Sequence, residues 1–80
     1  MSQLSAPEDL EGYVHERLVH VIGSPLAVEA LRAAKKAAEI DNISTVAHVI
    51  AVGKILAVQE GFVGIVGDLI VLEAERWGTR

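Results

Sequence analysis

The fold is decided by residues 46–72, which read VAHVIAVGKILAVQEGFVGIVGDLIVL. Twelve of the 18 valine and isoleucine residues lie between Ile43 and Val71, together with four of the seven glycines. Side chains branched at Cβ are stiff about χ1 and fit a pleated sheet, whereas an interior glycine costs a helix about 1 kcal/mol relative to alanine. This composition therefore favours β-strands over helices.

Glycine-containing pairs divide this stretch at intervals of about seven residues, at Gly53-Lys54, Glu60-Gly61 and Gly67-Asp68. Because Gly-X pairs suit type II′ hairpin turns, the pattern predicts a short antiparallel β-meander. Its strands are expected near Val46–Val52, Ile55–Gln59, Phe62–Val66 and Leu69–Glu75.

The same residues also allow helices. Ser44 could cap a helix that runs to Gln59, and Asp68 could cap another that reaches Trp77. On a helical wheel, however, Lys54 falls among the apolar residues of the first helix, and the charged residues of the second are scattered. An all-α chain, with four helices or a long helical hairpin, is therefore the alternative to the sheet.

Two helices are predicted in the N-terminal half, over residues 6–22 and 25–39. A capping box at residues 5–8 marks the start of the first helix, and Gly23 marks its end. Pro25 suits the first turn of the second helix, where its missing N–H costs nothing. One face of that helix is nearly all alanine, which allows close packing on a flat partner. We therefore expect an α+β domain in which the two helices pack on the C-terminal meander.

The chain has 80 residues, enough for one small domain over 1–80, and residues 1–5 are expected to form a disordered tail. A folded monomer of this size exposes about 4,700 Å² against about 12,000 Å² when unfolded, so it hides roughly 60% of its surface. Yet 51% of the residues are hydrophobic and only 22% are charged. Some apolar side chains must stay outside the core of a monomer, which predicts a homo-oligomer, either a dimer or a larger assembly.

We expect the self-association surface in the C-terminal half, because the strand pattern makes both faces of residues 63–72 apolar. One face would lie on the chain's own core and the other on a second copy, across a two-fold axis. Trp77 suits either a core contact or an interface hot spot. The predicted interface residues are Val63, Ile65, Val66, Ile70, Leu72 and Trp77.

Composition argues against several classes of protein. The chain has no cysteine, so disulfides and thiolate metal clusters are excluded and a reducing, cytoplasmic location is expected. The acidic N-terminus does not resemble a signal peptide, and no uncharged run approaches the ~20 residues of a membrane span. A net charge of −4 opposes attraction to a phosphate backbone, which argues against nucleic acid as a partner.

No motif for catalysis, a cofactor or a metal is recognisable, so the chain is not expected to be an enzyme. The predicted function is a non-catalytic interaction or scaffold module whose partner is itself or another protein. In one alternative, Arg32, Lys35 and Lys36 form a basic cluster that contacts an anion, an acidic partner or, in a dimer, nucleic acid phosphates. In another, His48 acts with a carboxylate in a small hydrolase or lyase.

Overall fold

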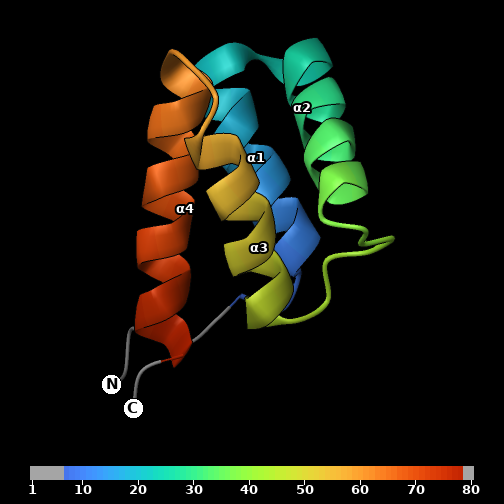
Figure 1. Ribbon diagram of the computed structural model, residues 1–80, viewed down its shortest axis with the longest axis vertical. Coiled ribbons are helices and arrows are strands. Elements are labelled where there is room, and N and C mark those ends of the chain that lie inside the picture. The colour runs from blue at the N-terminus through green and yellow to red at the C-terminus, as the bar shows by residue number, and fades with distance from the viewer. Residues whose placement is uncertain (1–6, 79–80) are drawn as a thin grey trace.

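The computed structural model describes residues 7–78, which form four helices that run alternately up and down (Figure 1). The helices are α1 (Leu10–Ile22), α2 (Ser24–Ala37), α3 (Val46–Ala57) and α4 (Phe62–Gly78). In Figure 1, α4 and α2 form opposite sides of the bundle, and α1 and α3 lie between them. The backbones of α2 and α4 do not approach each other closely, and each packs on α1 and α3, which are the inner helices of the domain.

The predicted α+β fold with its β-meander is wrong, because the described residues contain no strand and residues 46–72 form α3, a turn and most of α4. The four-helix alternative is confirmed, although α4 begins at Phe62 rather than near Asp68. The glycines misled the prediction, since only Gly61, with a φ of 77°, lies in the turn. The other three are inside the helices, at Gly53, Gly64 and Gly67.

The interior glycines allow α3 and α4 to approach each other closely. A Cβ atom on Gly67 would lie 2.7 Å from the Cα of Ala57, and one on Gly53 would lie 2.7 Å from Cγ2 of Val71. Real Cβ atoms essentially never lie within 3.0 Å of such neighbours. The close approach therefore requires glycine. It allows the most extensive contact between any two helices of the bundle, and this contact offsets the cost of glycine inside a helix.

The core is built from apolar side chains of all four helices and from Ile43 in the loop between α2 and α3. The largest fully buried side chains are Leu18, Leu56, Ile70, Val14, Val49 and Val52. Four of these six are β-branched, so burial against neighbouring helices outweighs their small helix penalty. Within residues 7–78, none of the helices is both long and apolar enough to span a membrane.

Short polar side chains and glycine set the helix boundaries. Asp9 caps α1 by accepting a hydrogen bond from the Gly12 amide at 2.9 Å, which starts the helix four residues later than predicted. The predicted capping residue Ser5 and the expected tail at 1–5 lie outside the described residues. Gly23, with a φ of 84°, joins α1 directly to α2, as the sequence predicts.

Candidate functional site

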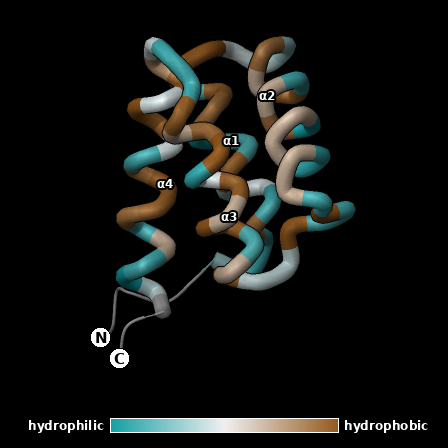
Figure 2. Tube along the Cα trace, viewed as in Figure 1, coloured by the Kyte–Doolittle hydropathy of each residue, from teal (hydrophilic) through white to brown (hydrophobic). Residues whose placement is uncertain are grey.

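The outward side of α4 carries a row of large apolar side chains that the described chain leaves uncovered. The row consists of Phe62, Ile65, Leu69 and Leu72, which are 68%, 58%, 50% and 58% exposed. Their alternate spacing of three and four residues aligns them on one side of the helix, like the apolar positions of a heptad. Figure 2 shows hydrophobic bands recurring along the length of α4. We call this row the α4 outer face.

Charged side chains border the α4 outer face. Asp68 occupies an exposed position beside it, and Glu75 is exposed about two turns further along the helix, on the same edge. Arg76 continues the row beyond Leu72 at the same spacing. An apolar patch with a charged rim is typical of a surface that binds another protein.

A groove of about 380 Å³ between α2 and α3 is the second apolar surface, and we call it the alanine groove. It is lined by Ala30, Ala33, Ala34, Ala37, Ile55, Leu56, Gln59 and Val63. Ala34 and Leu56 are buried at its floor, whereas Ala33 and Ala37 are exposed. The predicted alanine face therefore packs only partly on the core, and the remainder stays open because alanine is too short to fill the space between the helices.

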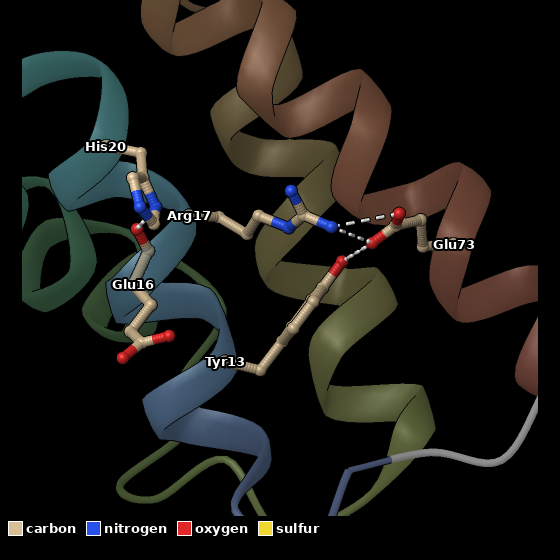
Figure 3. Close-up of polar contacts among 5 residues, drawn as sticks. All are labelled: Tyr13, Glu16, Arg17, His20 and Glu73. Atoms are coloured by element: carbon tan, nitrogen blue, oxygen red, sulfur yellow. Dashed lines mark hydrogen bonds and ion pairs between the residues drawn. The ribbon is translucent and has the colours of Figure 1, made fainter.

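A polar cluster joins α1 to α4 (Figure 3). The hydroxyl of Tyr13 donates a hydrogen bond to Oε1 of Glu73, and Nη2 of Arg17 donates to Oε1 at 2.9 Å and Oε2 at 3.0 Å. Burial raises the pKa of Tyr13 to about 12, and the hydrogen bond to Glu73 acts in the same direction. Because Tyr13 and Arg17 both donate hydrogen bonds to Glu73, the cluster holds α1 against α4.

Trp77 packs inside the chain against this cluster. Its ring lies edge-on to Tyr13, with 4.9 Å between the ring centroids and 71° between the ring planes. Aromatic pairs in this geometry add about 0.5–1.5 kcal/mol beyond the area that they bury. Of the two roles that the sequence suggests for Trp77, the contact within its own chain is therefore the one observed.

The structure divides the predicted basic cluster. Nζ of Lys35 lies 2.9 Å from Oε2 of Glu11, whose Oε1 accepts a hydrogen bond from the amide of Ile43 at 3.0 Å. These two contacts lower the pKa of Glu11, the amide hydrogen bond having the larger effect. Arg32 and Lys36 are exposed, Arg32 at a polar cleft of about 720 Å³ that Lys35 and Glu11 also line. Only two of the three cations thus remain open to a partner.

His48 caps the first turn of α3. Its ring Nδ1 accepts a hydrogen bond from the amide of Ser44 at 3.1 Å, while its own amide donates to Oγ1 of Thr45 at 3.1 Å. The pair of hydrogen bonds resembles a capping box with histidine in the place of glutamate, except that the ring accepts from the amide of Ser44, one residue before the N-cap Thr45. Among the hydrogen bonds of the described residues, those of His48 are to Ser44 and Thr45 and none is to a carboxylate.

The predicted interface residues fall on different sides of α4. Ile65 and Leu72 belong to the α4 outer face, whereas Val66 and Ile70 are 3% and 0% exposed in the core. Val63 lines the alanine groove. Sequence reasoning missed Phe62 and Leu69, although their spacing of three and four residues from Ile65 and Leu72 was visible once the segment was read as helix.

Within residues 7–78, no group of three or more histidine, aspartate or glutamate side chains is arranged to hold a metal ion. A comparison with family models, curated proteins and solved structures finds no match for this chain. Function is therefore inferred from the two apolar surfaces, the α4 outer face and the alanine groove.

Proposed function

We propose that this domain is a non-catalytic interaction module that self-associates through the α4 outer face. The observation that carries the proposal is the alignment of Phe62, Ile65, Leu69 and Leu72, each at least half exposed, on a single helix. Full burial of one such side chain contributes about 1.5–3 kcal/mol, so covering four half-exposed ones contributes several kcal/mol. A folded partner surface is the simplest cover.

The structure offers the partner a rigid surface. α4 is fixed by close contact with α3 and by the cluster of Tyr13, Arg17 and Glu73 that joins it to α1. A helix that is already ordered loses little conformational entropy on binding, which favours association. The row covers only about one and a half heptads, which is too short for an isolated coiled coil and suits docking between preformed bundles.

Two further observations support a binding role over catalysis in the part of the chain that the structure describes. His48 is engaged in capping α3, and Tyr13, Arg17 and Glu73 satisfy one another. The cytoplasm stays the proposed location, because the chain contains no cysteine and secreted small domains usually depend on disulfides.

Sedimentation equilibrium at micromolar concentrations tests the proposal. The wild-type chain is expected to sediment well above 8.5 kDa, and Leu69→Lys is expected to sediment as a monomer because it places a charge in the apolar contact. Val28→Lys is the matched control, since Val28 is 41% exposed on α2 and lies outside both apolar surfaces. A monodisperse wild-type species of 8.5 kDa would contradict the proposal.

A further inference from the structure

The alanine groove is apolar, and residues 7–78 do not fill it. α4 contributes only Val63 to the lining of the groove. Val63 and Leu69 are six residues apart, so they point about 120° away from each other around the helix. The α4 outer face is therefore turned away from the groove of the same chain and cannot occupy it.

The sizes of the side chains on the two surfaces are complementary. Above the buried floor of the groove, α2 offers only alanine, at half-buried Ala30 and exposed Ala33 and Ala37, so a second helix can approach closely. The α4 outer face offers the opposite, a ridge of phenylalanine, isoleucine and leucine at 62, 65, 69 and 72. A ridge of large side chains entering a groove of small ones is the usual way in which helices pack.

The charges beside the two surfaces are also complementary. Lys36 is exposed on α2 next to Ala33, three residues away and therefore a neighbour on the helix surface. Arg32 is exposed one turn before Lys36, and the one acidic residue on this edge of α2 is Glu29. Asp68 borders the α4 outer face. The edge of α2 is thus positive in balance where the edge of α4 carries a carboxylate.

Pairing of two α4 helices lacks this complementarity. In an antiparallel pair centred on the apolar row, the Asp68 residues of both copies would lie near the two-fold axis on the same edge. In a parallel pair, Asp68 would face the edge that carries Glu73 of the second copy. Both arrangements bring carboxylates together, and the one cation on α4, Arg76, lies about two turns from Asp68 at the end of the row.

The geometry points to head-to-tail association, in which the α4 outer face of one copy occupies the alanine groove of the next; this rests on the proposed self-association. Each copy then uses two different surfaces, so the contact is heterologous rather than two-fold symmetric. Such contacts close into a ring or continue as a filament. In an open assembly, one end always has a free groove and the other end a free α4 outer face.

Two variants that each lose one surface test the pairing. Leu69→Lys disables the α4 outer face and keeps the groove, whereas Ala33→Glu places a charged side chain in the groove and keeps the α4 outer face. Both positions are exposed, so both variants are expected to fold, which circular dichroism checks. Each variant alone is expected to associate at least about tenfold more weakly than wild type, while their mixture forms a 1:1 dimer and nothing larger.

Three other results would contradict head-to-tail association. If Ala33→Glu associates as strongly as wild type while Leu69→Lys is monomeric, α4 pairs with itself, and the inference fails while the proposed function stands. If both variants are monomeric and their mixture stays monomeric, the groove is not the binding site for α4. A wild-type chain that is itself monomeric overturns both. Ala37→Glu, at a second exposed position in the groove, replaces Ala33→Glu if that variant does not fold.

Discussion

Between α3 and α4 the helix backbones lie close together at glycine residues, whereas α1 adds polar side-chain contacts to the apolar ones that Val14 and Leu18 make in the core. A Cβ atom added at Gly67 would clash with backbone atoms of the partner helix, and one added at Gly53 would crowd side-chain atoms there. On α1, by contrast, Glu11 reaches Lys35 and Ile43, and Tyr13 reaches Glu73. The first contact depends on shape and is indifferent to pH and salt, while the second depends on charge and protonation. Substitutions should therefore act differently in the two regions.

The largest effect is expected from Gly67→Ala in the α3–α4 contact. The new Cβ would meet backbone atoms of Leu56 and Ala57, which cannot rotate away, so the two helices must separate. Overpacking of this kind costs about 1–3 kcal/mol, and we expect it to outweigh the gain of about 1 kcal/mol in helix propensity. Urea denaturation should show a lower midpoint.

Gly53→Ala is the matched control for that contact. Its nearest neighbour would be Cγ2 of Val71, a side-chain atom, so the clash can be relieved. Gly53→Ala should cost less than Gly67→Ala, and combining it with Val71→Ala should recover most of the loss. If Gly67→Ala is as stable as wild type, close backbone packing does not determine the α3–α4 contact.

An intermediate effect is expected from the contact between α1 and α4. Tyr13→Phe removes the hydrogen bond to Glu73 and should cost about 1 kcal/mol near neutral pH. Burial raises the pKa of Tyr13 from 10.0 to about 12, so the folded state favours the neutral phenol. Its contribution to stability is complete below pH 10 and is lost as the pH rises towards 12.

Tyr13 is the only tyrosine in the chain, so the absorbance of tyrosinate reports this group alone. The folded chain should titrate well above the same chain in urea. The stability of Tyr13→Phe should lack the fall between pH 10 and 12 that is due to this group. A titration of the folded chain near pH 10 would show that the hydroxyl is neither buried nor held by Glu73 as the structure has it.

The smallest effect is expected from Glu11. The amide of Ile43 and then Lys35 lower the pKa of Glu11 from 4.5, so its contribution is present above pH 4.5 and is lost as the pH falls below that value. Glu11→Gln should remove this acid dependence and cost about 0.5 kcal/mol at neutral pH, because the pair with Lys35 is partly exposed. Added salt should reduce the difference between variant and wild type, while the cost of Gly67→Ala should be insensitive to salt.

The contrast between the two regions also explains which parts of the site the sequence predicts. Ile65 and Leu72, predicted as interface residues, are exposed in the structure, while their role in an interface stays a prediction. Val66 and Ile70 are equally apolar and differ only in the direction they face around α4. In a helix, that direction repeats about every 3.6 residues, whereas the strand interpretation assumed a repeat of two residues and so assigned the faces wrongly.

The alanine groove could not be predicted from sequence. The alanines of α2 indicate close packing, but the sequence does not show whether a neighbouring helix covers all of them. In the structure Ala34 is 2% exposed, while Ala33 and Ala37 remain open because α2 packs against α1 and α3 along one side only. The capping role of His48 was missed because the sequence suggests Ser44 as the N-cap of this helix. The N-cap is Thr45, whose side chain accepts a hydrogen bond from the amide of His48.

The sequence by itself determines the two N-terminal helices and their junction at Gly23, because capping residues, proline and helical periodicity act within a few positions along the chain. It also determines that the apolar content exceeds one small core. Tertiary structure alone decides between helix and strand in residues 46–72. There, glycine and β-branched residues disfavour helix locally, and the close contact of α3 with α4, between residues distant in the chain, reverses that preference through burial and backbone packing.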